Sequence, residues 1–195
     1  LVSRLDEVSR FLGDHDLSDA AVQGQLDSLR EQLGQQKLIV AFVAEFSRGK
    51  SELINAIFFA ASGRRLLPAQ PGRTTMCPVE IGWDAALPPQ LALLPLASRL
   101  DPRPLDEWRR EADAWTCIDI DPADAARSAE TLLELTRTRA LPLDEARALG
   151  LLRGESPLDV PPLLAEGLVE VPAWRHARLN YPHPLLERGL SVLDT

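Results

Sequence analysis

Apolar positions along the chain change their spacing, and each change predicts a different element. Over residues 1–36 they recur at helical spacing in two sets, separated by residues 13–18, which predicts two amphipathic helices. The positions that define these helices are Leu1, Leu5, Val8 and Leu12, and then Val22, Leu26, Leu29 and Leu33. Over residues 37–43 the helical period gives way to a continuous apolar run. Such a run is typical of a central parallel strand that is covered on both faces.

The remainder of the chain alternates helix-like and strand-like segments. Residues 50–60 carry apolar side chains at helical spacing, and the glycine- and proline-rich stretch 62–75 predicts a loop. Strands are predicted at residues 79–83, 91–96, 168–180 and 190–194, and helices at 104–112, 122–138 and 142–151, each helix starting at a proline. We therefore expect an α/β fold, in which a central, largely parallel sheet is wrapped by helices and preceded by an N-terminal helical segment.

Candidate chemistry lies where the first predicted strand meets the next helix. The sequence there is Ala-Glu-Phe-Ser-Arg-Gly-Lys-Ser, over residues 44–51. A strand, a loop ending in Gly-Lys-Ser and a helix are the parts of a phosphate-binding loop, in which backbone N–H groups at a helix N-terminus hold phosphate oxygens. The residues predicted to bind nucleotide are Ala44, Glu45, Phe46, Ser47, Arg48, Gly49, Lys50 and Ser51. We therefore expect the sheet of a P-loop nucleoside triphosphatase.

Three residues of this loop have separate tasks. Gly49 allows the backbone to pass close to a phosphate, Lys50 is placed to neutralise the β- and γ-phosphates, and Ser51 is placed to ligate Mg²⁺. A surface helix that begins with Gly-Lys-Ser is the alternative interpretation. Ala44 stands where most such loops have glycine, and an alanine forced to positive φ would be strained by about 1 kcal/mol or more.

Composition and charge limit the possible partners and the cellular compartment. The chain has 195 residues, of which 45% are hydrophobic, which is enough for one sizeable core. A formal net charge of -8, without a concentrated Lys/Arg cluster, argues against a nucleic-acid partner. Cys77 and Cys117 have neither disulfide-framework nor zinc-site spacing, which fits a reducing cytoplasm. The chain starts at Leu1 without Met and stops at Thr195 directly after an apolar run, so we expect both ends to be cuts.

Residues 42–56 closely resemble the phosphate loop and following helix of bacterial dynamin-like GTPases, and the parts Ser-Arg-Gly-Lys-Ser and Leu-Ile-Asn-Ala are the most characteristic. Two further segments have the same resemblance. Residues 66–79, with Leu-Leu-Pro, then Arg-Thr-Thr and Pro-Val, are similar to the first switch loop of that family. Residues 184–195 are similar to the strand that leads into its Asp-Thr-Pro-Gly motif, so we expect Pro and Gly to follow.

The resemblance assigns roles to individual residues. It implies that Thr75 closes over magnesium and the γ-phosphate, and that Asp194 holds magnesium through a water. The implied catalytic residues are Lys50, Ser47 and Thr75, and the implied metal ligands are Ser51, Thr75 and Asp194. Two alternatives stay open: Thr74 and Thr75 as an ordinary turn-to-strand junction, and Asp194 as an aspartate that caps a turn.

The family also implies an organisation and an activity. Residues 1–36 would be a helical neck or bundle segment and residues 37–195 part of a GTPase domain, with residues 84–167 as an elaboration between the first switch and the strand before Asp194. The implied activity is binding of GTP and GDP with Mg²⁺, and hydrolysis of GTP to GDP and phosphate. The implied partners are guanine nucleotide, other copies of the protein through their GTPase domains, and a membrane contacted peripherally at its inner face by regions that this chain does not contain.

The loop departs from dynamins at its third position. Dynamins proper have a glutamine there, thought to help orient the attacking water, whereas this chain has Phe46, whose ring cannot do so. Ser47 matches the serine that follows that glutamine, and Arg48 is either an arginine finger or a solvated loop charge. Two other functions therefore remain open. One is a nucleotide-binding assembly or regulatory module that hydrolyses nothing. The other is a P-loop ATPase, because the motif that recognises guanine normally comes later in the sequence than Thr195.

Overall fold

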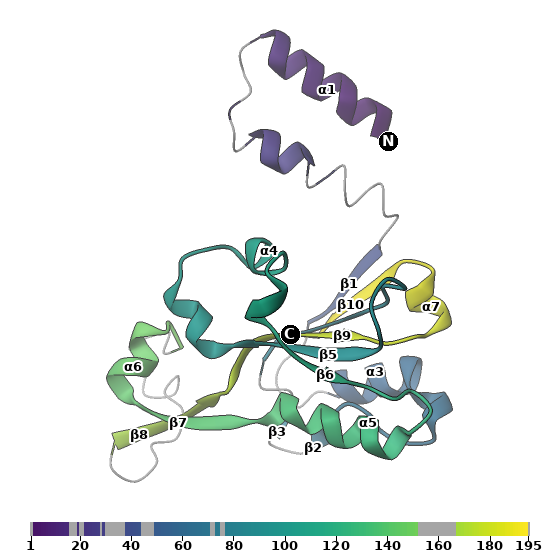
Figure 1. The fold of residues 1–195 in the computed structure, drawn as a ribbon, viewed down its shortest axis with the longest axis vertical. Coiled ribbons are helices and arrows are strands. Elements are labelled where there is room, and N and C mark those ends of the chain that lie inside the picture. Colours follow the sequence, from purple (N-terminus) through teal and green to yellow (C-terminus); the bar gives the residue numbers. More distant parts are fainter. Residues whose placement is uncertain are drawn as a thin grey trace.

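The computed structural model describes residues 2–15, 19, 22–27, 29, 38–43, 49–70, 73–74, 77–151 and 167–194. They form a mixed α/β structure with a mainly sheet core and several helices (Figure 1). Helix α1 (Val2–Asp14) and the helical residues 22–27 precede this core, which confirms the first predicted helix and the start of the second. Leu33 of the second predicted helix lies outside the described residues. The side chains of Val8 and Phe11 on α1 are exposed. The apolar stripe of α1 is therefore only partly covered.

Six strands form the central sheet in the order β1-β10-β4-β9-β5-β6. Their bounds are Leu38–Phe42 for β1, Val79–Gly82 for β4, Gln90–Pro95 for β5, Thr116–Asp119 for β6, Trp174–Asn180 for β9 and Leu190–Asp194 for β10. The pairs β1–β10 and β4–β9 are parallel, whereas β10–β4, β9–β5 and β5–β6 are antiparallel. The described sheet is thus mixed rather than largely parallel, because apolar spacing reports burial and does not report strand direction.

Strand β1 lies at the edge of this sheet. Its neighbour among the described strands is β10, and Leu38 and Ile39 are 64% and 58% exposed. The prediction of a central strand covered on both faces is therefore wrong for the described part of the chain. A continuous apolar run shows that a strand tolerates burial, but it does not determine how many strands lie beside it.

One face of the sheet carries the main hydrophobic core. It is covered by α3 (Lys50–Phe58), α5 (Ala125–Leu132) and α7 (Pro184–Glu187), and Figure 1 shows α3 and α5 below the sheet. Side chains at alternate strand positions point into this core, as the two-residue period of a strand requires. The core residues include Ile54, Phe58, Phe59, Leu66, Leu67, Val79, Ile81, Leu91, Leu93, Leu132, Ala177, Leu179 and Val192. Helix α3, which carries the predicted lysine and serine, is therefore anchored to the sheet.

The helices after residue 100 are shorter than predicted. Helices α4 (Leu105–Trp108) and α6 (Leu143–Ala148) each begin directly after a proline, whereas α5 begins after Asp124, whose carboxylate accepts from two backbone N–H groups. The 3-10 turn η4 (Leu133–Thr136) ends this helical segment. The chain then becomes strand β7 (Thr138–Pro142), where the sequence predicts the end of one helix and the start of the next.

A second, smaller sheet lies beside the central one. Strand β7 pairs antiparallel with β8 (Leu168–Pro172), and the predicted strand 168–180 is in fact two strands separated at Ala173. Helix α6 packs on this sheet around a small core of Leu96, Leu141, Ala146, Val169 and Val171. The described part of segment 84–167 thus adds β5 and β6 to the central sheet and contributes β7 and α6 to the second. The remaining short elements are β2 (Ala69–Gln70), β3 (Arg73–Thr74), η1 (Ala60–Ser62), η2 (Leu96–Leu100) and η3 (Ala112–Ala114).

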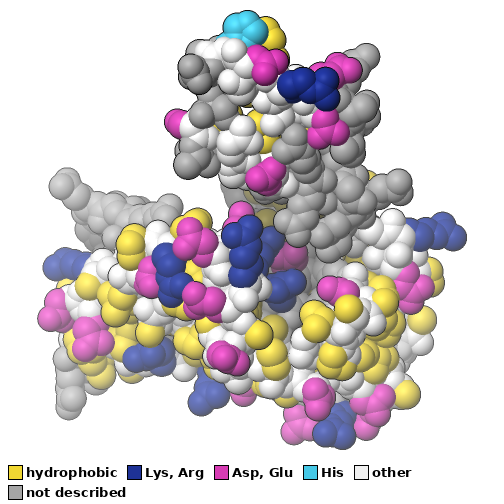
Figure 2. Space-filling model, turned by 45° about the horizontal axis from the view of Figure 1, so that its top comes forward, with side chains coloured by type: hydrophobic (Ala, Val, Ile, Leu, Met, Phe, Trp, Pro, Cys, Tyr) yellow, Lys and Arg dark blue, Asp and Glu magenta, His cyan; other side chains and the backbone are white. Residues whose placement is uncertain are grey.

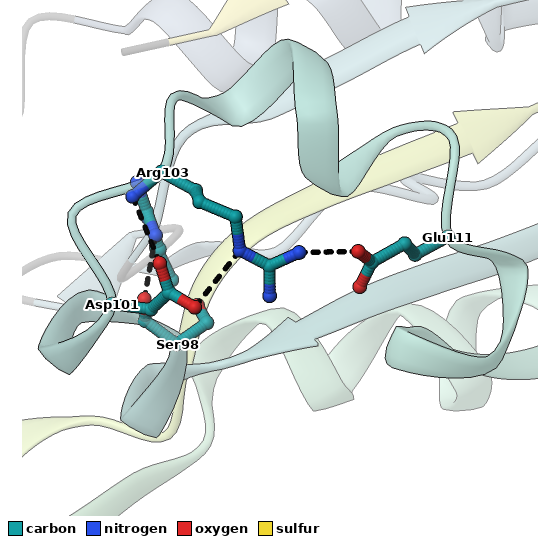
Figure 3. A network of polar contacts seen from close by, with 5 residues as sticks. Ser98, Asp101, Arg103 and Glu111 are labelled. Atoms are coloured by element: carbon teal, nitrogen blue, oxygen red, sulfur yellow. Dashed lines mark hydrogen bonds and ion pairs between the residues drawn. The ribbon is translucent and has the colours of Figure 1, made fainter.

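The opposite face of the central sheet is covered by the segment around α4, which packs on a small apolar cluster of Ala92, Leu94 and Trp115 and is also held by polar contacts. Arg103 Nε donates to Asp101 Oδ2 at 2.8 Å, and the same guanidinium pairs with Glu111 (Figure 3). The Cζ atom of Arg103 lies 4.0 Å from the ring centroid of Trp108. The backbone N–H of Arg103 and its guanidinium both hold the pKa of Asp101 below its ordinary value.

Glu80 of β4 links this segment to the sheet. Arg109, which follows α4, donates from Nη2 to Glu80 Oε2 at 2.6 Å, and His176 Nε2 of β9 lies 3.8 Å from the same oxygen. Burial by itself would raise the pKa of Glu80. The nearby His176, Arg109 and Arg178 outweigh this effect and lower the pKa of Glu80 below its ordinary value.

This contact predicts an acid-dependent contribution to stability. Because the folded pKa of Glu80 is lowered, its charge stabilises the fold above the unfolded value, near 4.5, and that contribution is lost as the pH falls through the folded value. We expect Glu80→Gln to lower the free energy of unfolding by about 1 kcal/mol at pH 7, and by progressively less in acid. Urea titrations from neutral to acid pH measure this difference. Glu7→Gln, on the exposed surface of α1, is the control. A loss of unfolding free energy in Glu80→Gln that does not change with pH would contradict a stabilising role for the charge of Glu80.

Candidate functional site

Three separate chain segments meet at one end of the strand pair β1–β10. Phe42, the last residue of β1, lies opposite Asp194, the last residue of β10. On the other side of β10, Asp194 lies opposite Val79, the first residue of β4. Asp194 therefore lies between the strand that leads into the predicted phosphate loop and the strand that follows the predicted switch threonine. Backbone pairing alone brings these segments together.

The start of α3 has the conformation that a phosphate loop requires of its last glycine. Gly49 has φ 81° and ψ 17°, in the left-handed region where a side chain would be strained. Lys50 is the first residue of α3, and Leu53 N donates to Gly49 O at 2.9 Å to begin the helical hydrogen bonds. The free N–H groups of a first helical turn attract anions. The glycine is therefore needed at this position for its backbone conformation.

Ser51 and Asp194 are in direct contact, although 143 positions separate them in sequence. The Ser51 hydroxyl donates to Asp194 Oδ2 at 3.2 Å, and the two residues are 4% and 1% exposed. A hydroxyl and a carboxylate are oxygen ligands of the kind that Mg²⁺ prefers. Among the described residues, no group of three or more His, Cys, Asp and Glu side chains gathers in a cluster that would hold a metal. The pair fits a Mg²⁺ that takes its other ligands from phosphate and water.

The structure brings four of the predicted site residues to one place, namely Gly49, Lys50, Ser51 and Asp194. The other predicted site residues lie outside the described part of the chain; they are Ala44, Glu45, Phe46, Ser47, Arg48 and Thr75. Their roles stay predictions. Thr195, of the expected Asp-Thr-Pro-Gly motif, lies outside it as well.

Asn55 is a buried polar residue to which the sequence assigns no role beyond its part in the Leu-Ile-Asn-Ala resemblance. It lies on α3, four residues after Ser51, and it is 5% exposed. Its Oδ1 accepts from the N–H groups of Leu66 and Leu67 at 3.0 and 2.9 Å, and its Nδ2 donates to the Leu67 carbonyl at 2.9 Å. The signal in the sequence is an amide between the apolar residues Ile54 and Ile57, on a helix that otherwise buries hydrophobic side chains.

One face of the molecule carries mixed charge. On the face that Figure 2 shows, Lys and Arg side chains lie among Asp and Glu side chains and do not gather into one basic patch. None of the helices in the described ranges is both long and apolar enough to cross a membrane.

Comparisons with known proteins add a distant structural similarity. No family model matches the chain, and no curated protein matches its sequence. Two solved structures, both described as an oligomerised bacterial dynamin pair that provides a mechanism for the long-range sensing and tethering of membranes, are similar to it with 11% sequence identity. The TM-scores are 0.38 and 0.37, over 99% of this chain and 23% of each of those chains. The chain thus spans less than a quarter of their length. A similarity at these scores does not indicate a function for this chain.

The contact between Ser51 and Asp194 predicts an energetic coupling in the absence of any ligand. A buried hydrogen bond to a carboxylate should give a coupling free energy of about 1 kcal/mol or more in a double-mutant cycle of Ser51→Ala and Asp194→Ala. Urea unfolding of the parent, the two single variants and the double variant measures it. The matched control combines Ser51→Ala with Ser191→Ala, since Ser191 is also buried on β10 but its side chain points to the opposite sheet face. If the losses of unfolding free energy in the two single variants add up to the loss in the double variant, the contact does not contribute to stability.

Proposed function

We propose that this chain binds guanine nucleotide and Mg²⁺ at the start of α3, and that the intact protein hydrolyses GTP to GDP and phosphate as a dynamin-like GTPase. The observation that carries this proposal is the buried contact between Ser51 and Asp194 at the shared end of two parallel strands. A Gly-Lys-Ser helix start and a carboxylate at the end of the neighbouring strand are the two protein parts of a P-loop magnesium site. A surface helix that began with these letters by coincidence would not bury its serine against such a carboxylate.

Each described residue then has a task in holding the nucleotide. The backbone N–H groups at the start of α3 and the Lys50 ammonium bind the β- and γ-phosphates. The Ser51 hydroxyl would be a direct ligand of the metal, and Asp194 would hold the metal through a water. When bound, Mg²⁺ neutralises charge that develops on the phosphate oxygens during transfer. The side chains themselves supply position and electrostatic stabilisation, and no covalent step on the protein is needed.

The position of β4 supports the role of Thr75. Val79, fixed opposite Asp194, follows Thr75 by four residues, and four residues span at most about 14 Å. We infer that this short connection allows Thr75 to act at the Ser51–Asp194 pair. In our proposal its hydroxyl closes over magnesium and the γ-phosphate only when the triphosphate is bound.

The resemblance to dynamin-like proteins is also the basis for proposing self-assembly. We infer cytoplasmic homo-oligomers that associate through their GTPase domains and contact the inner face of the membrane peripherally. The exposed Val8 and Phe11 of α1 are suited to packing in a helical bundle.

Phe46 favours a second candidate function, a nucleotide-binding assembly module without turnover. An aromatic ring at the third loop position cannot orient an attacking water, so binding and hydrolysis must be measured separately. Calorimetry with GTP, GDP and ATP determines affinity and base preference. Phosphate release over hours with excess Mg²⁺ determines turnover. GTP binding without phosphate release would favour the module, and a preference for ATP would favour a P-loop ATPase.

We expect Lys50→Ala in the full-length protein to abolish nucleotide binding without unfolding it, because the cation that faces the β- and γ-phosphates is lost while the core under α3 is unchanged. Calorimetric titration with GTP and GDP, together with a thermal unfolding curve, measures both effects. Lys37→Ala removes the only other lysine of the chain and is the matched control. Normal GTP affinity in Lys50→Ala would remove the basis of the site assignment.

We expect Thr75→Ala to leave GDP affinity unchanged and to lower GTP turnover about 100-fold or more, since a group that acts only in the triphosphate state contributes mainly to the transition state. Steady-state phosphate release and GDP titration measure the two quantities. The control is Thr74→Ala at the neighbouring position. Equal losses of GDP and GTP binding would show that Thr75 is structural.

A further inference from the structure

Asn55 connects the helix that begins the phosphate site to the segment that leads to Thr75. Its side-chain amide makes three hydrogen bonds, of 3.0, 2.9 and 2.9 Å, and all of them go to the backbone of Leu66 and Leu67. An asparagine amide has two acceptor and two donor positions, so three of the four are used on one dipeptide. Because these partners are backbone atoms, the contact determines the path of the chain itself.

The dipeptide is fixed on its other side as well. The side chains of Leu66 and Leu67 are both 1% exposed in the main core, among the residues that pack α3 against the sheet. Buried N–H and C=O groups are costly when they lack partners, and Asn55 supplies partners for three such groups in a stretch that belongs to neither a helix nor a strand. The chain is therefore held to α3 at this point both by packing and by hydrogen bonds.

Two fixed points thus enclose the segment that contains Thr75. Leu67 lies eight residues before Thr75, and Val79, opposite Asp194, lies four residues after it. Asn55 and Ser51 are four residues apart, which places them on the same side of α3, and both are buried. The proposed magnesium ligand and the start of the Thr75 segment are consequently both attached to α3, with Asn55 as the connection to the segment.

We propose that Asn55 is a positioning residue for GTP hydrolysis, which holds the start of the switch segment at a fixed place relative to Ser51 so that Thr75 can reach the γ-phosphate side of the site. This proposal rests on the proposed function. Asn55 lies one turn away from the nucleotide, and its amide is engaged by the protein backbone, so it acts through Thr75 and does not touch substrate. It should therefore affect turnover more than it affects binding of GDP.

The test measures phosphate release and GDP affinity in the full-length protein for Asn55→Ala, Thr75→Ala and the double variant. We expect Asn55→Ala to lower kcat for GTP about 10- to 100-fold and to leave GDP affinity close to that of the parent. If Asn55 acts through Thr75, the double variant has the turnover of Thr75→Ala alone. Losses that multiply in the double variant would overturn the proposal.

Two further variants separate positioning from general stability and from failure to fold. Asn55→Asp keeps oxygens that can accept from Leu66 and Leu67 N–H and loses only the donor, so we expect turnover between those of the parent and Asn55→Ala; if Asn55→Ala does not fold, the cycle with Thr75 uses Asn55→Asp. Leu141→Ala, in the separate small core of the second sheet, destabilises the fold in a cluster that contains no residue of the switch segment, and it should keep its kcat. The same loss of kcat in Leu141→Ala would make Asn55 merely structural. A parent without GTP turnover would overturn the proposed function and this proposal together, whereas an active parent with an unchanged Asn55→Ala would overturn this proposal alone.

Discussion

The parallel pairing of β1 with β10 is the constraint on which the candidate site depends. Its register sets Asp194 opposite Phe42, directly before the phosphate loop, and the antiparallel pairing of β10 with β4 sets Val79 opposite Asp194 from the other side. A slip of one residue in either pairing would turn Asp194 to the other face of the sheet, away from Ser51. The hydrogen bond of 3.2 Å between Ser51 and Asp194 therefore depends on the register of β10 with its neighbouring strands.

The two faces of the central sheet are covered by different elements. The face below holds the main core and α3, so that the nucleotide-binding helix is supported by apolar packing. The opposite face combines a smaller apolar cluster around Ala92, Leu94 and Trp115 with polar contacts, such as that of Glu80 on β4 with Arg109 after α4. Since β4 begins just after the proposed switch segment and carries Glu80 at its second position, the same strand connects the site on one side to the segment around α4 on the other.

The sequence predicts most elements that surround the site and predicts their arrangement less well. Strand β1, helix α3 and strand β10 follow from local patterns. The assignments of Lys50 and Ser51 follow from the spacing of the phosphate-loop motif, and that of Asp194 follows from the resemblance to dynamin-like GTPases. The mixed strand directions and the edge position of β1 depend on pairings between distant segments, which apolar spacing does not encode. Strand β6 was missed because three of its four residues are exposed, and β7 was missed because it lies across the junction between two predicted helices, from residue 138 to residue 142. The hydrogen bonds of Asn55 go to a dipeptide eleven and twelve residues away, which no helical period indicates.

The edge position of β1 has a thermodynamic consequence. In the described structure β1 has strand β10 as its neighbour and buries little of its apolar surface, so local opening at this edge requires less free energy than opening of the central strands. A ligand that binds only the closed form stabilises that form in proportion to the logarithm of its concentration. Nucleotide bound between β1 and α3 would therefore raise the protection of β1 amides against exchange much more than it would raise that of β4 or β9, and occupancy of the site would set how firmly the edge of the sheet is closed.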